Sequence, residues 1–376
     1  MEKFIFKKLY NNITLFFIVS LISVSLIIWI IQAINYLDIV SEDGHGLKIY
    51  FMYTLYNLPK IVSRILLFMF FTSVFFIILR YEEKNELLLF WINGINKSDF
   101  SKKIIKFSLM YLIIQLILSS FIVPYTQFKA KSFLRSSKIE YLPSIVTEQK
   151  FNDAIKNLTI FIERKENNML YNVLIKEELS KDSFQIITAK KGLFNLKGGT
   201  NFLILSEGKI INNEKGSINS FSFKNTEINL SNYISKRTLY PKIQEASLMD
   251  LLFCFKESFF LKKLNLKLKK PEYLICNKDF MGEIFKEIAK RLYLPFYIPL
   301  VAMIASILIL SSRDYINHNY FKTLVYLNGF GTIVVSEISI RYAGKSNESN
   351  ILFFCLPIVI FLINYLFFRK KLKVSK

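Results

Sequence analysis

Histidine and cysteine are scarce in this 376-residue chain, which contains two histidines and three cysteines. The histidines, His45 and His318, fall on opposite faces of the membrane in the topology derived below, so a catalytic histidine pair is excluded. The cysteines at positions 254, 276 and 355 form no C-x-x-C pair, and their spacing indicates neither a metal knuckle nor a disulfide framework. We therefore expect no metal site.

Signatures of nucleotide binding and hydrolysis are also missing. Gly344-Lys345-Ser346 ends like a P-loop, but Ser339 stands where the first glycine belongs. Neither H-E-x-x-H nor G-x-S-x-G occurs. We expect no catalytic residue and no bound cofactor, so the energy for any work must come from a partner.

Charged residues are rare in several long apolar runs. The chain is 52% hydrophobic with a mean hydropathy of +0.33, and about 20 helical residues cross the ~30 Å hydrocarbon core of a bilayer. Six runs predict membrane-spanning helices: residues 13–34, 61–79, 104–123, 292–310, 324–340 and 351–368. Glu337 is the exceptional carboxylate within them. It is a functional candidate, or it reaches the interface or pairs with Arg341 at i+4.

The formal charge of +21 lies mainly in the flanks of these runs and in the C-terminal tail. No nucleic-acid-binding pattern accompanies it, so we expect no nucleic-acid partner. Lys and Arg in short loops mark the cytoplasmic side. With six spans, the basic N-terminus, the loops after the second and fourth spans, and the basic tail all share that side. The long segment between the third and fourth spans then lies outside.

That external segment has the pattern of β-structure. Short stretches with two-residue alternation, such as "NLTIFIER" and "NFLILSEGKII", are separated by turn-rich pieces such as "KENN" and "KGGT". Regularly spaced short strands predict a sandwich, jelly roll or barrel. A helical pattern returns before the fourth span. Its basic stretch "LKKLNLKLKK" suits either a solvated linker or an acidic membrane surface.

The order of features along nearly the whole chain resembles the LptF/LptG (YjgP/YjgQ) permease family. The matching features are "NLPK" at the start of the second span, Glu86 with an apolar run closing at Gly94, "TEQKF" before the first strands, "LILSEGKI" in a later strand, and "EIAKRLYLP" at the start of the fourth span. The strand sequences resemble those of LptF more than those of the sister permease LptG, because no tryptophan-bearing terminal strand follows. The last feature contains Glu287 and Arg291, to which the resemblance gives a structural role.

The resemblance implies an α-helical integral membrane protein with six transmembrane helices and an inserted periplasmic β-jellyroll. It would lie in the inner membrane of a Gram-negative bacterium, with both termini in the cytoplasm. We expect four parts: residues 1–123 with the first three spans, 124–245 with the jellyroll, 246–291 as a basic helical connector, and 292–376 with the last three spans and tail.

The segment matching the family's coupling helix, about residues 82–94, begins with acidic residues. The helix dipole favours anions at that N-terminal end. Apolar residues follow at i, i+3 and i+4, and a glycine suited to ending a helix follows at i+7. We expect Glu86, Leu87, Phe90, Trp91 and Gly94 to contact the ATPase LptB. The alternative is an interfacial helix lying on lipid, although such helices favour basic polar faces.

The resemblance further implies a transporter that moves lipopolysaccharide from the inner membrane into the jellyroll. Its partners would be the sister permease, two copies of LptB with ATP and magnesium, LptC, and a periplasmic bridge of like domains. The first span lacks the cationic residues of relatives, so Lys48, Lys60 and Arg64 are substitute candidates for phosphate contact. Ile160, Ile162, Val173 and Ile175 share one strand face by alternation, which suits either an acyl-chain groove or an ordinary sheet core.

Two other functional classes fit the same composition. A membrane scaffold would use the β-domain only to bind a partner, and a lipid-modifying enzyme would need an unrecognised site. Co-purification separates them, because a transporter should bring along an ATPase and a second permease, whereas a scaffold need not.

Overall fold

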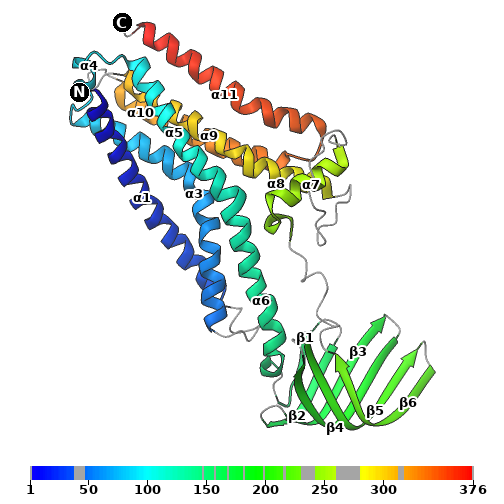
Figure 1. Ribbon diagram of the computed structural model, residues 1–376. Helices are drawn as coiled ribbons and strands as arrows, with labels where there is room; N and C mark the ends of the chain where they lie inside the picture. The colour runs from blue at the N-terminus through cyan, green and yellow to red at the C-terminus, as the bar shows by residue number, and fades with distance from the viewer. Residues whose placement is uncertain are drawn as a thin grey trace. The chain divides into compact units, whose positions relative to one another are not determined.

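The structure is a computed structural model that describes residues 2–37, 47–145, 148–155, 158–166, 169–180, 183–197, 200–214, 217–229, 242–259, 280–311 and 317–374. The chain divides into two compact units (Figure 1). A helical unit contains residues 1–31, 57–128 and 242–376. A second unit, which carries the β-sheet, contains residues 32–56 and 129–241.

Six helices in the described part of the chain are long and apolar enough to cross a membrane: Glu2–Asn35, Leu47–Glu83, Lys97–Leu134, Met281–Leu310, His318–Tyr342 and Glu348–Leu372. The number of spans predicted from the sequence is thereby confirmed. The corresponding elements are α1 (Glu2–Asn35), α3 (Leu47–Glu83), α5 (Lys97–Ile117), η1 (Leu118–Ile122), α6 (Val123–Ile145), α8 (Met281–Leu292), η6 (Leu294–Phe296), α9 (Tyr297–Ser306), η7 (Ile307–Leu310), α10 (His318–Tyr342) and α11 (Asn347–Val374).

Prolines account for two interruptions within these spans. Pro124 has no N–H to donate to the carbonyl of Ser120, and the π-helical turn η1 lies just before it. Pro295 lies in the 3-10 turn η6 between α8 and α9. Because α6 continues to Ile145, the part of the chain assigned from the sequence to the jellyroll begins as helix. The first strand starts only at Phe151.

The core of the helical unit forms around α3 and α9. The most apolar window of α3 is 67% buried, and that of the α8–α9 span is 72% buried. Small residues allow close helix contact: Ser101 of α5 and Ser306 of α9 share a buried hydrogen bond of 2.6 Å. Gly329 of α10 lies against Phe71 of α3, where a Cβ atom would come within 2.1 Å of the ring.

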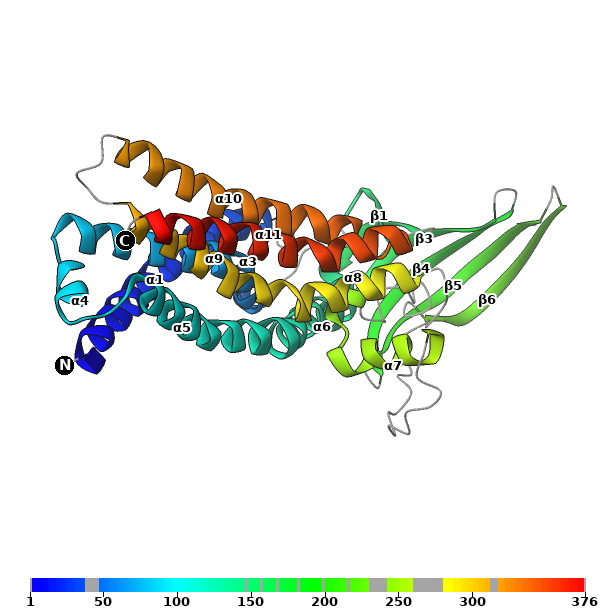
Figure 2. The same cartoon turned by 90° about the horizontal axis from the view of Figure 1, so that it is seen from above.

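The periphery of the helical unit is exposed. Only 17% of the apolar window of α1 is buried, as are 33% of that of α10 and 22% of that of α11. In a membrane-spanning chain these faces suit lipid or another subunit. The segment α4 (Leu88–Ile92), the N-terminus and the C-terminal end of α11 lie at the same end of this unit, and α7 (Leu248–Phe259) lies toward the other (Figures 1 and 2).

The β-sheet contains six antiparallel strands in sequential order. They are β1 (Phe151–Ile155), β2 (Leu158–Glu166), β3 (Met169–Ser180), β4 (Ser183–Lys197), β5 (Thr200–Glu214) and β6 (Ser217–Asn229). The alternating stretches "NLTIFIER", from its leucine onward, and "NFLILSEGKII" lie in β2 and β5, as the alternation predicted. The sequence predicted a sandwich, jelly roll or barrel, but the described strands form one open sheet, with β1 at one edge and β6 at the other.

Candidate functional site

The segment between α3 and α5 is shorter and more sharply turned than the helix predicted over residues 82–94. Glu82 and Glu83 still belong to α3. Asn85 then adopts a positive φ of 57°, which interrupts the helix, and α4 contains only Leu88–Ile92. Gly94, with a φ of 77°, occupies the left-handed conformation expected of a glycine that ends a helix.

Aromatic contacts attach α4 to its own helical unit. Phe90 is fully buried and meets Phe6 of α1 and Phe100 of α5, each edge-on with ring centroids 5.1 Å apart. The backbone N–H of Glu86 donates to the carbonyl of Tyr81 at 2.8 Å. Glu86 also forms an ion pair with Lys8 of α1 at 3.5 Å. The loop is thus fixed to three helices of the bundle.

The residues that α4 presents to its surroundings differ from those expected to contact the ATPase. Leu87 and Phe90 were predicted to face a partner, but they are 7% and 0% exposed and pack into the chain's own core. The exposed apolar side chains are Leu88, Leu89 and Ile92, which are 52%, 50% and 80% exposed. Leu87 and Phe90 therefore face the chain's own core, whereas contact of the segment with an ATPase stays a prediction.

A cavity of about 510 Å³ lies beside α4. It is lined by Trp91, residues 94–99 and Leu372 of α11. Trp91 itself is partly buried against Phe100, with ring centroids 5.9 Å apart. Of the five predicted contact residues, Trp91 and Gly94 therefore border an open groove, and Glu86 is partly exposed. Together with the exposed face of α4, this groove forms one surface to which another protein can bind.

The candidate cations for substrate phosphate belong to both units of the chain. Lys60 and Arg64 lie one turn apart on α3 in the helical unit, whereas Lys48 lies on the part of α3 that belongs to the other unit. Lys60 Nζ donates to Gln127 Oε1 at 3.1 Å, and Gln127 Nε2 donates to Asn57 Oδ1 at 2.7 Å. Lys60 is therefore engaged in a polar contact between α3 and α6, while Arg64 is exposed.

The four aliphatic candidates of the β-sheet lie on one face, as alternation predicted. Ile160, Ile162, Val173 and Ile175 are each at most 2% exposed and belong to a single apolar cluster. Their position fits the core role in this structure. Contact with an acyl chain stays a prediction.

A polar row crosses the sheet where the register of neighbouring strands skips one pair. It consists of Glu163, Asn172, Lys190, Glu207 and Lys224, one from each of β2 to β6. Asn172 and Glu207 adopt positive φ angles of 51° and 55°. Aligned irregularities of this kind bend a sheet and reverse which residues face the core. No pattern in the sequence predicted this row.

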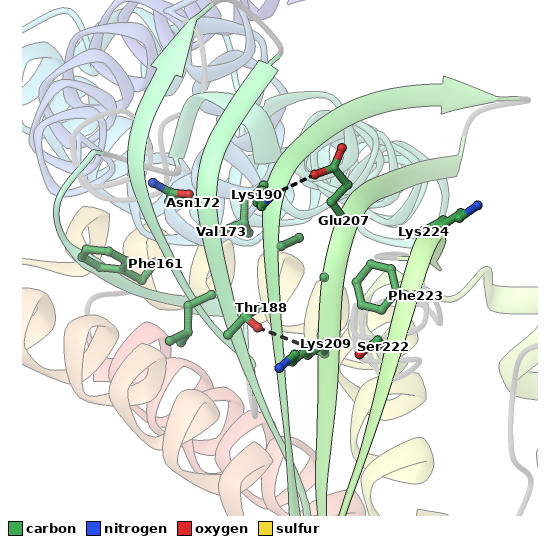
Figure 3. Close-up of a pocket in the computed structure, with 13 residues that line it drawn as sticks. Phe161, Asn172, Val173, Thr188, Lys190, Glu207, Lys209, Ser222, Phe223 and Lys224 are labelled. Carbon is green, nitrogen blue, oxygen red and sulfur yellow. Dashed lines mark hydrogen bonds and ion pairs between the residues drawn. The ribbon is translucent and has the colours of Figure 1, made fainter.

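A cavity of about 680 Å³ lies beside the polar row. Its other side is the paired row Phe161, Leu174, Thr188, Lys209 and Ser222. Figure 3 labels Asn172, Lys190, Glu207 and Lys224 of the polar row and Phe161, Thr188, Lys209 and Ser222 of the other. Gly208 lies between them, and a Cβ atom there would come within 2.1 Å of the Thr188 carbonyl oxygen. The lining passes from aromatic and aliphatic side chains to exposed lysines, which suits a ligand with both apolar and anionic groups.

Lys190 and Glu207 form an ion pair of 2.9 Å within this row. The hydrogen bond from Lys190 and then its positive charge lower the pKa of the Glu207 carboxyl below its ordinary value. Both side chains are exposed, so solvent and salt screen the pair. We assign it a role in holding the bend rather than a large contribution to stability.

Glu287 and Arg291, both in α8, form a polar contact where the chain re-enters the helical unit. This contact is called the joint below. Arg291 is 2% exposed, and its Nε donates to Glu287 Oε1 at 3.0 Å. Its Nη1 and Nη2 donate to the carbonyls of Ala246 and Gln244 at 2.8 and 2.9 Å. These hydrogen bonds attach α8 to the segment that follows the β-sheet. They give the pair the structural role that was expected for it.

The remaining candidates from the sequence are the carboxylate within the spans, potential metal ligands and the cysteines. In the described part of the chain, Glu337 and Arg341 are exposed and form no ion pair. No group of three or more potential metal ligands occurs among the described residues. Cys254 of α7 is disulfide-bonded, against the expectation from cysteine spacing, and Cys355 is free. Cys276 and the basic stretch 261–270 lie outside the described residues.

Comparison with known proteins assigns the chain to a family. The family described as lipopolysaccharide export system permease LptF/LptG matches residues 8–371. The chain belongs to the LptF/LptG family. It is also 25% identical over 268 residues to a protein of Rickettsia prowazekii (strain Madrid E) described as uncharacterized protein RP871, covering 69% of this chain and 74% of that protein.

The LptF/LptG match covers both units of the chain, so the six apolar helices and the β-sheet belong to one permease architecture. A permease is a transporter component rather than an enzyme. At this level the chain is a membrane protein of lipopolysaccharide export.

Proposed function

We propose that this chain is an LptF-like permease subunit of an ABC transporter that extracts lipopolysaccharide from the inner membrane. The sister permease LptG is the alternative assignment within the family. A separate LptB-like ATPase dimer would bind ATP and magnesium and drive the movement. An LptC-like protein and a bridge of like β-domains would receive the lipid, which passes along the apolar face of the sheet.

One observation carries this proposal beyond family membership. The short helix α4 buries Phe90 in its own bundle and exposes Leu88, Leu89 and Ile92 beside a groove. An exposed apolar face on a helix that is held by buried contacts suits a partner protein that binds there and moves the bundle. An interfacial helix on lipid would instead favour basic polar residues, whereas the residues just before α4 include Glu82, Glu83 and Glu86.

The same arrangement supports an orientation. The N-terminus, α4 and the end of α11 share one end of the helical unit (Figures 1 and 2), and the described part of the basic loop after α3 belongs to that end. We place it in the cytoplasm. The disulfide-bonded Cys254 of α7 suits an oxidising compartment, which fits a periplasmic location for the other end and for the β-sheet.

Affinity purification of the tagged full-length chain from its own membranes tests this function. We expect an ATPase and a second six-span permease to purify with it, and the reconstituted complex to release lipopolysaccharide from proteoliposomes only with ATP. A chain that brings along neither protein, or that hydrolyses ATP by itself, would contradict the proposal. Recovery of a periplasmic partner without an ATPase would favour the scaffold alternative.

A further inference from the structure

The cavity of about 680 Å³ beside the polar row lies on the face of the sheet opposite the apolar core. Val173 and Ala189 contribute to its lining, yet both side chains are buried in the core cluster. Successive side chains of a strand point to opposite faces, so the residues before and after each of these two point away from the core. Those neighbours belong to the polar row on one side and to the row of Phe161 and Ser222 on the other (Figure 3). The cavity is therefore separate from the apolar face along which we propose that the lipid passes.

The outer face of the sheet changes from apolar to polar along this cavity. Phe161 of β2 pairs with Leu174 of β3, and Leu174 pairs with Thr188 of β4. Thr188 in turn pairs with Lys209 of β5, which pairs with Ser222 of β6. Paired residues have Cβ atoms about 4.5–5.5 Å apart, so Lys209 has a hydroxyl group on each neighbouring strand. One end of the cavity thus offers an aromatic ring, and the other offers an ammonium group with two hydroxyls.

Lysines give the polar end of the cavity an excess of positive charge. The lining contains Lys190, Lys209 and Lys224, all exposed, and a single carboxylate, Glu207. Lys190 is already paired with Glu207 at 2.9 Å. Lys209 and Lys224 form no ion pair with another described residue. Two ammonium groups therefore remain for an anionic ligand.

We propose that this cavity binds a phosphorylated sugar. Its volume lies within the range of small-molecule sites, about 300–1,000 Å³, whereas a lone phosphate would leave the aromatic end empty. The apolar face of a sugar ring can pack on Phe161, and Thr188 and Ser222 can form hydrogen bonds with its hydroxyl groups. Lys209 and Lys224 then bind the phosphate.

This inference goes beyond the proposed function, because such binding requires neither an ATPase nor transport. Two sources present the same chemistry: the sugar part of lipopolysaccharide and a separate phosphorylated glycan. The two sources differ in whether lipopolysaccharide competes for the site.

Isothermal titration of the purified full-length chain in detergent tests the site, with glucosamine 1-phosphate as the probe. We expect this sugar phosphate to bind at least about tenfold more tightly than inorganic phosphate or glucosamine. Lys209→Ala combined with Lys224→Ala should weaken its binding about tenfold or more, because both unpaired cations are removed. Both side chains are exposed, so the double variant should keep the wild-type unfolding temperature.

Competition with lipopolysaccharide then identifies the source of the ligand. Displacement of the probe from the wild-type chain would assign the site to the sugar of the transported lipid. A probe that binds as expected but is not displaced would assign the site to a separate glycan.

The matched control is Lys191→Ala, because Lys191 is exposed on the same strand as Lys190 but is not among the lining residues. It should leave binding of the probe unchanged. Equal affinity for inorganic phosphate and the probe, or binding that survives the double substitution, would overturn the proposal. A loss with Lys191→Ala as large as with the double variant would also overturn it. The titrations contain neither ATPase nor ATP, so these results would leave the proposed function untouched.

Discussion

A chain carrying Ile92→Asp should reach the membrane in normal amounts but lose its ATPase during purification. Ile92 is 80% exposed, so the aspartate costs the fold of the isolated chain little. In the complex it would place a charge where we propose an apolar contact. Burying one large apolar side chain contributes about 1.5–3 kcal/mol, and a desolvated charge adds to the loss. We expect affinity to fall by about a hundredfold or more.

Two comparisons make this prediction specific. Ile218→Asp changes another highly exposed apolar residue, 71% exposed in the sheet, and should leave ATPase binding intact. Phe90→Ala removes a fully buried ring that meets Phe6 and Phe100, so it should lower accumulation of the chain in the membrane. Normal ATPase recovery with the Ile92→Asp chain would show that α4 does not bind the partner through this face.

Arg291→Ala should prevent stable accumulation of the full-length chain. The substitution leaves the partly buried Glu287 carboxylate without its cation and removes the donors to Ala246 and Gln244. Breaking a buried ion pair by removing one partner costs about 3–5 kcal/mol. The measurement is abundance in the membrane fraction together with the midpoint of thermal unfolding in detergent.

Lys290→Ala provides the control for this substitution, because it removes a cation from the adjacent position without touching the joint. It should change neither abundance nor unfolding midpoint. If the Arg291→Ala chain unfolded at the wild-type temperature, the joint between α8 and residues 242–246 would contribute nothing to the fold.

The sequence predicted the membrane helices well because their main determinant is local. About 20 residues without charge span a bilayer whatever they pack against. Span ends were less predictable, since helices continue past the apolar run into water: α6 reaches Ile145 and α3 begins at Leu47. The strands β2 to β6 were likewise predictable from the sequence, because two-residue alternation and turn residues are local signals.

What the sequence could not provide was the direction of the apolar stripe in α4. A helical spacing identifies one face but not its neighbour, and Phe90 pairs with Phe6, which is far away along the chain. The signal that could have helped is the run of consecutive apolar residues from Leu87 to Ile92. Such a run cannot bury all of its side chains on one side of a single short helix.

The aligned irregularities of the sheet escaped prediction for a related reason. Asn172 and Glu207 adopt positive φ. In β3 the alternation changes by one residue there, because Leu170 and then Val173 and Ile175 are buried. The consequence appears only across strands, where five polar residues form a row beside the cavity of Figure 3. A strict two-residue period followed along one strand therefore assigns the wrong face beyond that point.

Photo-crosslinking in intact cells tests the central claim most directly. A photoreactive amino acid is placed at position 92 of the full-length chain, and the adducts are identified by mass spectrometry. The account predicts a crosslink to a soluble, nucleotide-binding ATPase on the cytoplasmic side. A crosslink to a periplasmic protein, or only to lipid in cells that actively export lipopolysaccharide, would contradict it.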